Sequence, residues 1–150
     1  MVKRVGSLSA ALSKYKDMNA SVRVGVLENA TYPDGTPVAM VAFWNEYGTR
    51  TSPVRAFFRT TVSEQKKNWV LSVQNLMKMH NNPQQVMGLI GEHMKGNIVQ
   101  SIVSFSDPKN ADSTERAKGF NNPLIDKGIL MRSISFEVGE GDWFNNIIVL

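Results

Sequence analysis

The sequence contains no cysteine, which excludes disulfides, thiolate metal sites, iron-sulfur clusters and thiol nucleophiles. Histidine is scarce as well. Only His80 and His93 are present, and they fall on different expected helices without an acidic or serine partner at a recognised spacing. The segment Gly91-Glu92-His93 lacks the second histidine that the helical zinc motif requires. We therefore expect a protein that is not an enzyme and that binds neither a metal nor another cofactor.

Long apolar runs are missing too. No segment approaches the length of a membrane span, and the polar stretch after Met1-Val2-Lys3-Arg4 has no apolar run long enough for a signal peptide. Charge of one sign is not concentrated either: 17 Lys and Arg face 13 Asp and Glu, a formal net charge of +4 that is spread along the chain. This scattered excess is only a weak indication of nucleic-acid binding. We expect a protein that is made and kept in the cytoplasm.

The remaining composition is that of an ordinary globular protein. Hydrophobic residues make up 42% and charged residues 20% of the 150 positions, so the chain is expected to fold. A chain of this length suits one compact unit with a hydrophobic core. We therefore expect a single domain over residues 1–150.

Alternating residues predict one strand in the first part of the chain. The order of residues at 21–27 puts Val22, Val24 and Val26 on one face, with an arginine and a glycine on the other. A short amphipathic helix is expected before this strand, at 7–17, because its leucines recur at helical spacing.

Turn residues mark the next two elements. Residues 29–36 collect Asn, Pro, Asp and Gly, which predicts an exposed loop. A helix is expected at about 37–47. Thr36 is the expected cap, Pro37 suits the first helical position, and Gly48 suits the left-handed position just past the end.

Two long helical patterns follow. The first runs from about 55 to 80 and the second from 83 to 105, and the break between them predicts an antiparallel helical hairpin. Their apolar stripes consist of Phe58, Val62, Trp69, Val73 and Leu76 in the first helix and of Val86, Ile90, Met94, Ile98 and Ile102 in the second. Gly91 and Gly96 are expected at places of close backbone packing, because glycine otherwise weakens a helix.

The last third of the chain combines a polar segment with strand patterns. Residues 106–122 are polar apart from Phe120 and predict a long mobile loop. A short helical turn is expected at 123–131, and two strands are expected at 133–138 and 143–150, joined by a glycine-rich turn. The expected fold class is α+β, in which a small antiparallel sheet packs against the two long helices in a single domain.

Two groups of side chains admit a functional as well as a structural interpretation. Four methionines are expected in the core, although such a stripe also suits adaptable binding; they are Met77, Met79, Met87 and Met94. A second group interleaves aromatic and basic residues, as surfaces for single-stranded nucleic acid do; it consists of Trp44, Tyr47, Phe57 and Phe58 with Arg50, Arg55 and Arg59. Burial of these aromatics in helices is the favoured interpretation.

Two strings of residues stand out by their order. The first has two parts, Val-Ala-Phe-Trp-Asn-Glu-Tyr-Gly-Thr at 41–49 and Ser-Pro-Val-Arg-Ala-Phe-Phe-Arg at 52–59. The second, at 122–134, reads Asn-Pro-Leu-Ile-Asp-Lys-Gly-Ile-Leu-Met-Arg-Ser-Ile. In order and separation they resemble the tail-completion and head-to-tail neck proteins of tailed bacteriophages. That family has Asn/His-Glu-Phe/Tyr-Gly-Thr, then Pro-x-Arg-x-Phe, then Pro-Leu-x-Asp-Thr-Gly-x-Leu-x-x-Ser-Ile. The resemblance covers about residues 20–140, and Lys127 departs from the usual Thr.

The residues of these strings also have a physical interpretation without the family. Glu46 stands in the last turn of its helix, where the dipole disfavours a carboxylate, and Arg55 stands near the start of the next, where a cation is disfavoured. We therefore expect Glu46 and Arg55 to pair within one subunit. Asp126 is expected to cap the turn that follows it, and Gly128 to allow close approach of backbone.

Because members of the family act as rings, the strings either specify the fold alone or also lie at subunit contacts, and both interpretations stay open. The hypothetical interface with another subunit or partner consists of Trp44, Glu46, Tyr47, Thr49, Arg50, Pro53, Arg55, Phe57, Asp126 and Gly128.

The resemblance implies a structural virion protein of a tailed bacteriophage or prophage, a tail-completion or neck component. The implied partners are further copies of the chain in a ring, expected to be a hexamer, and other neck, tail-terminator or tail-tube proteins. Weak, non-specific contact with DNA in the channel is also implied, and the protein would move from the host cytoplasm into the virion. The alternative is a basic DNA-binding module of phage origin. A hydrolase is a third interpretation, which lacks an arrangement of nucleophile and base.

Overall fold

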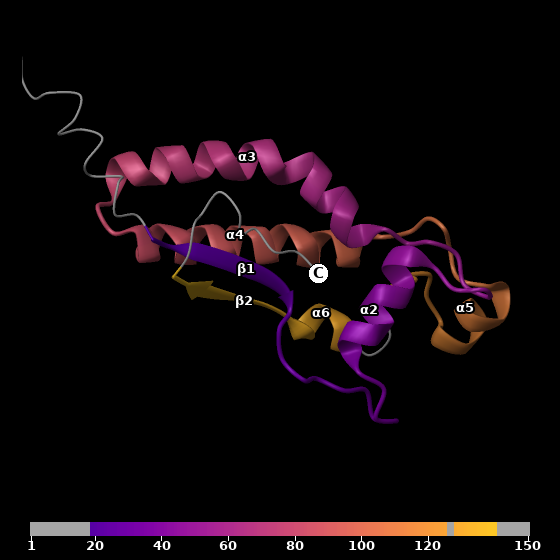
Figure 1. Cartoon of the computed structure of the whole chain (residues 1–150). Helices are drawn as coiled ribbons and strands as arrows, with labels where there is room; N and C mark the ends of the chain where they lie inside the picture. Colours follow the sequence, from indigo (N-terminus) through magenta and orange to yellow (C-terminus); the bar gives the residue numbers. More distant parts are fainter. Residues whose placement is uncertain (1–18, 126–127, 141–150) are drawn as a thin grey trace, which may run out of the picture.

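The computed structural model of the chain describes residues 19–125 and 128–140. The helix expected at 7–17 and the strand expected at 143–150 lie outside these residues. In chain order the elements are β1 (Ser21–Val26), α2 (Val38–Tyr47), α3 (Phe57–Met79), α4 (Pro83–Ser104), α5 (Asp112–Lys118), α6 (Ile129–Ser133) and β2 (Ile134–Gly139). Figure 1 shows them in these labels.

β1 and β2 pair antiparallel, although 107 residues separate the end of one from the start of the other along the chain. Val22 and Val24 of β1 are buried, which confirms the face predicted from the alternation. Val24 lies opposite Phe136 in the register. On the outer face, Arg23 forms an ion pair with Glu137, its direct cross-strand neighbour.

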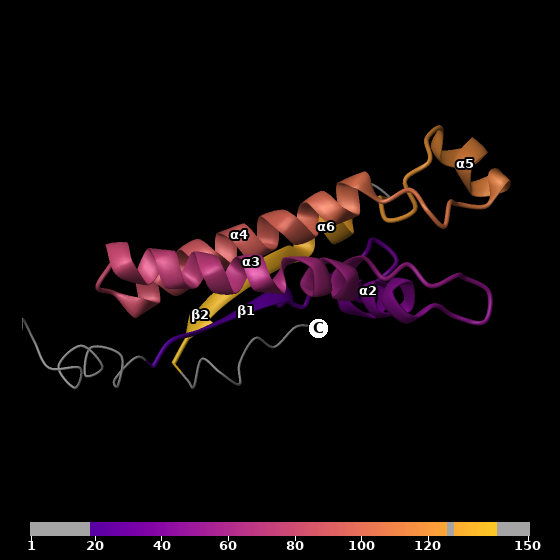
Figure 2. The ribbon, with the colours of Figure 1, turned by 90° about the horizontal axis from the view of Figure 1, so that it is seen from above.

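The two long helices form an antiparallel hairpin over one face of this sheet (Figures 1 and 2). α4 lies against both strands, and α3 packs along α4. All five residues of the apolar stripe predicted for α4 are buried, which confirms the four-residue spacing. Asn82 caps this helix, because its side-chain oxygen accepts hydrogen bonds from the backbone N–H groups of Gln84 and Gln85. The α+β class expected from the sequence is thus confirmed.

The start of α2 differs from the prediction. Pro37, not Thr36, occupies the capping position, and no side chain of the described residues caps the helix. The backbone takes over this role, because the loop folds back on itself and the Val38 N–H donates to the Ala30 carbonyl oxygen at 2.9 Å. The predicted end of the helix is correct: Gly48 follows Tyr47 with φ +76°, which favours glycine.

The segment 106–122, here called the distal lobe, is not the structureless loop that its polar composition predicted. It contains helix α5, and that expectation was wrong for residues 112–118. The order of its charges suits a helix dipole, with Asp112 and Glu115 in the first turn and Arg116 and Lys118 in the last. Gly119, in the left-handed conformation, ends the helix.

The final elements lie close to where the sequence placed them. The helical turn expected at 123–131 is α6, which begins six residues later than expected, at Ile129. It leads directly into β2, so the strand expected at 133–138 is confirmed with a shift of one residue.

The two glycines inside α4 have different roles. A Cβ atom built on Gly91 would lie 2.2 Å from Cδ2 of Phe136 in β2, so the ring of Phe136 rests on the helix backbone at this point. This confirms the close packing expected for Gly91. At Gly96 the same atom would have no neighbour within 4 Å, so the expectation was wrong there.

The glycine pair supplies a matched test of this packing. We expect Gly91→Ala to lower the free energy of unfolding by about 1–3 kcal/mol, because it overfills the contact between α4 and the sheet. Gly96→Ala should raise the free energy of unfolding by up to about 1 kcal/mol, because alanine favours a helix and meets open space. Urea unfolding of both variants measures the difference. Equal stabilisation by both substitutions would contradict the packing of Phe136 on α4.

Candidate functional site

Helix α2 exposes its apolar side chains. Phe43 is 57%, Tyr47 56% and Trp44 43% exposed, while Val38 and Glu46 are its buried residues. The sequence of the helix contains the signal for this arrangement, because apolar residues occupy every side of it and one apolar face has to remain uncovered. An exposed aromatic face of this kind is typical of a surface that binds another protein.

The aromatic residues of α2 form an ordered cluster. The rings of Phe43 and Tyr47 lie one helical turn apart with their centroids 4.8 Å from each other and their planes tilted by 42°. The guanidinium of Arg59, from the first turn of α3, lies 5.2 Å from the centroid of the Tyr47 ring. This cation–π contact holds the edge of the cluster against α3.

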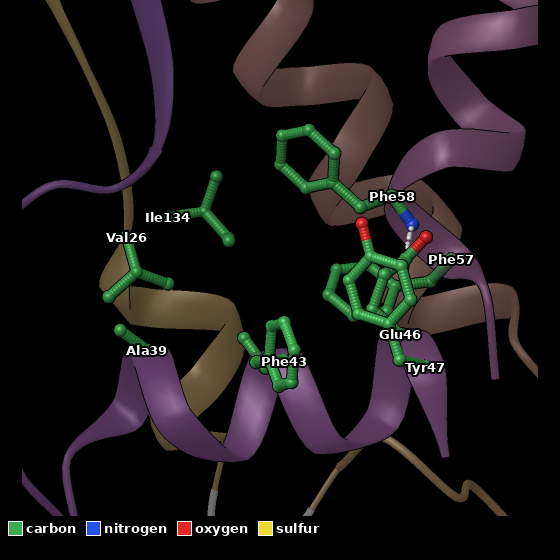
Figure 3. A pocket seen from close by; sticks show the side chains of 9 residues that line it. Val26, Ala39, Phe43, Glu46, Tyr47, Phe57, Phe58 and Ile134 are labelled. Atoms are coloured by element: carbon green, nitrogen blue, oxygen red, sulfur yellow. Dashed lines mark hydrogen bonds between the residues drawn. The ribbon is translucent and has the colours of Figure 1, made fainter. Parts of the chain in front are cut away.

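A cavity of about 220 Å³ opens between α2 and the rest of the domain (Figure 3). We call it the α2 pocket. Its walls come from α2, the end of β1, the first residues of α3 and the start of β2; the lining residues are Val26, Ala39, Ala42, Phe43, Glu46, Tyr47, Phe57, Phe58 and Ile134. Eight of these nine side chains are apolar or aromatic, so the pocket suits an apolar group.

Glu46 is the charged residue in this lining, and its carboxylate is already bound. One oxygen accepts a hydrogen bond from the Phe58 N–H at 3.0 Å and the other accepts from the Arg59 N–H at 3.1 Å. Figure 3 shows the carboxylate turned toward the backbone of α3. The residue at the capping position of α3, Ala56, has no polar side chain. Glu46 therefore caps α3 from the neighbouring helix and complements its dipole.

The predicted pair between Glu46 and Arg55 is wrong. Glu46 instead pairs with Arg59, whose Nε lies 3.4 Å from a carboxylate oxygen. Arg55 precedes α3, and it donates hydrogen bonds from Nε to the Pro108 carbonyl oxygen at 3.2 Å and from Nη2 to the Lys109 carbonyl oxygen at 3.3 Å. Partial burial lowers the pKa of Arg55 from its usual value. Glu46 and Arg55 each have a partner, as their unfavourable positions relative to the helix dipoles required. They are not paired with each other.

The other proposed interface residues divide into surface and core. Thr49 shapes the loop after α2, because its Oγ1 accepts hydrogen bonds from the N–H groups of Thr51 and Ser52. Arg50 and Pro53 are exposed on the same loop. Phe57, in contrast, is only 2% exposed and belongs to the hydrophobic core, so the isolated subunit does not present it at a surface.

The second string contributes Gly128, which is buried and occupies the capping position before α6 with φ +68°. The nearest atoms to a Cβ atom built there belong to side chains, Nη1 of Arg132 at 3.1 Å first, so the close approach of backbone expected at Gly128 is not found. Asp126 lies outside the described residues.

The two strings, separated by 62 residues from 60 to 121, meet around α2. A surface hollow next to the helix is lined from the first string by Val41, Trp44 and Asn45 and from the second by Pro123, Leu124 and Leu130. The fold thus brings together the residues that carry the family resemblance, and it places the exposed Trp44 at their junction.

The aromatic and basic group and the methionine group, for which binding roles were also considered, are largely structural. Phe57 and Phe58 are buried, and Arg55 and Arg59 are engaged within the subunit, so the aromatic and basic residues do not form one continuous surface. Met87 and Met94 are buried in the core, whereas Met79 is exposed at the end of α3.

In residues 19–125 and 128–140, no three His, Cys, Asp or Glu side chains gather closely enough to hold a metal ion. No helix in the same residues combines the length and apolar character needed to cross a membrane.

Comparisons with protein-family models, with curated proteins and with solved structures found no match to this chain. The resemblance to phage neck proteins therefore stays a prediction that rests on the two strings and on the way they meet.

The capping role of Glu46 can be measured by double-mutant cycles. Glu46→Ala removes two hydrogen bonds between a charged group and buried backbone, so we expect it to lower the free energy of unfolding by about 2–4 kcal/mol. Glu46→Gln keeps an acceptor oxygen and should lose less. Combined with Arg55→Ala, the loss should be additive within about 0.5 kcal/mol, because the two residues share no partner.

The matched control is Arg59→Ala, which removes the cation beside the same carboxylate. Its combination with Glu46→Ala should fall short of additivity by at least about 0.5 kcal/mol. Chemical unfolding followed by circular dichroism measures all the variants. Strong coupling with Arg55 and none with Arg59 would overturn the assignment of the partners.

Proposed function

We propose that this chain is a structural protein of a tailed bacteriophage or prophage virion, a tail-completion or neck component that forms a ring at the head-to-tail junction. The observation that carries the proposal is the meeting of the two family-like strings around α2, beside an exposed aromatic face. A protein with this role works by presenting a surface repeatedly around an axis.

The physical character of α2 supports an interaction surface. Both ends of the helix are tied to the domain through backbone hydrogen bonds, from Val38 to Ala30 at its start and from Arg55 to Asn45 near its end. Its outer face, however, leaves Phe43, Trp44 and Tyr47 about half exposed. A rigidly held helix with uncovered aromatic residues is a favourable centre for a protein interface, because large rigid side chains lose little entropy on binding.

Ring assembly also agrees with the modest size of this surface. Three half-exposed aromatic side chains offer on the order of 300 Å² of contact, whereas a stable interface buries about 800 Å² on each partner. A single contact of this kind is weak, but a closed ring makes each subunit bind two neighbours at once. The ring and its docking onto neighbouring neck, tail-terminator or tail-tube proteins then supply the remaining stability.

Contact with DNA is a minor part of the proposed role. The net charge of +4 suits weak, sequence-independent attraction to DNA passing through the ring. A site-specific DNA-binding module needs side chains that reach base edges, but Arg55 and Arg59 are held by Pro108, Lys109 and Glu46 within the subunit. We therefore favour the structural role.

The proposal predicts the phenotype of a phage that lacks this protein. Such a phage should make heads filled with DNA and should make tails, yet yield few infectious particles, because the two parts are not stably joined. Electron microscopy of lysates, with complementation in trans as the control, measures this. Normal infectious virions would refute the assignment, and empty or unassembled heads would indicate a role in the capsid.

A further inference from the structure

We propose that neighbouring subunits of the ring contact each other head to tail, with Phe120 of one copy inserted into the α2 pocket of the next. This inference rests on the proposed ring and names the contact that closes it. A cyclic ring of more than two identical subunits needs two different, complementary surfaces on each copy, one protruding and one hollow. Phe120 and the α2 pocket are such a pair.

Phe120 is the protruding group. It is 46% exposed at the end of the distal lobe, whose other side chains at 106–122 are polar or small. The Nζ of Lys118 lies 5.5 Å from the centroid of its ring and donates a hydrogen bond to the Asn122 carbonyl oxygen. Nearly half of the residue is open to solvent, so insertion of the ring into an apolar surface removes that part from water.

The α2 pocket has the size and chemistry to accept this ring. Its volume is about 220 Å³, and a cavity of about 150 Å³ lined by apolar side chains is known to hold one benzene molecule. The rings of Phe43 and Tyr47 stand at its mouth and are exposed by more than half. A phenyl ring that enters the pocket beside this pair gains aromatic contacts as well as burial.

The elements that carry the two surfaces lie at the same end of the hairpin but apart from each other. In the view from above, α5 lies on the side of α4 and α2 on the side of α3 (Figures 1 and 2). This placement lets one copy offer Phe120 to a neighbour on one side while its own pocket accepts a neighbour on the other. The end of the subunit that carries both family-like strings then becomes the rim of the ring.

Hydrogen bonds also fix the distal lobe to the rest of the subunit. Arg55, two residues before α3, donates to the Pro108 and Lys109 carbonyl oxygens. Asn122 donates to the carbonyl oxygens of Ile102 and Val103 at the end of α4. Both ends of the lobe are therefore tied to the hairpin, so an approaching pocket meets Phe120 in a defined position.

Association of the purified full-length chain provides the first test. We expect Phe120→Ala and Ala39→Trp, which fills the pocket, each to weaken self-association by at least about tenfold in analytical ultracentrifugation. Leu71→Ala, at another exposed apolar residue, is the matched control and should leave it unchanged. A mixture of the two weakened variants should form dimers but no larger species, because only one combination of intact surfaces remains. Recovery of full rings from the mixture would contradict a head-to-tail contact.

Cross-linking tests the contact directly, in protein and in assembled particles, because the natural chain has no cysteine. With a short bis-maleimide, the variant carrying Phe120→Cys and Ala39→Cys should give a ladder of multimers up to the closed ring. The control carrying Leu89→Cys in place of Ala39→Cys should give none. If the chain's own residues 143–150 fill the pocket instead, Leu150→Cys with Ala39→Cys will cross-link within one chain and the ladder will be absent, which overturns the inference.

These outcomes separate the inference from the proposed function. Rings that form in particles without the Phe120 ladder would overturn the contact and leave the ring in place. A deletion phage with normal infectivity would remove the proposed function itself, whatever the cross-linking shows. Thermal unfolding of each variant establishes that the substituted proteins fold, so a loss of association reports on the surface and not on stability.

Discussion

The carboxylate of Glu46 lies between the end of one helix and the beginning of another, and the arrangement of the candidate site depends on it. At the C-terminal end of α2 a negative charge is unfavourable, and burial of a charge is costly unless it is paired and hydrogen-bonded. Both costs are offset at the N-terminus of α3, where the N–H groups of Phe58 and Arg59 and the Arg59 guanidinium surround the carboxylate. This one group therefore sets how α2 lies against α3.

The position of α2 has two consequences for function. With Glu46 held against α3, Phe43 and Tyr47 line the α2 pocket beside it and stay more than half exposed. Arg59, which helps to neutralise Glu46, also lies over the ring of Tyr47 and connects the cap to the aromatic cluster. The surface offered to a partner is thus built on a buried charge, which gives it a defined geometry before any partner arrives.

The scaffold beneath this site is held by apolar packing of a different kind. The stripe of α4 covers both strands, and Gly91 allows Phe136 to approach the helix backbone. This packing keeps the start of β2 and the end of β1 in place, and both contribute walls to the pocket through Val26 and Ile134. A local polar network and a continuous core therefore meet at the same cavity, and each limits how far the other can shift.

Local patterns in the sequence were sufficient for the stripe of α4, the strand around Val24 and the end of α2 at Gly48, because each depends on residues a few positions apart. They also predicted a partner for Glu46, since the dipole of α2 disfavours a negative charge at the end of that helix. Only the tertiary structure decided that the partner is the start of α3 and not Arg55, that Phe57 is buried, and that Gly91 but not Gly96 is in close contact. The physical reason is that these outcomes depend on which distant segments approach one another in the folded chain. The spacing of residues along the sequence does not reveal how close such segments come in space.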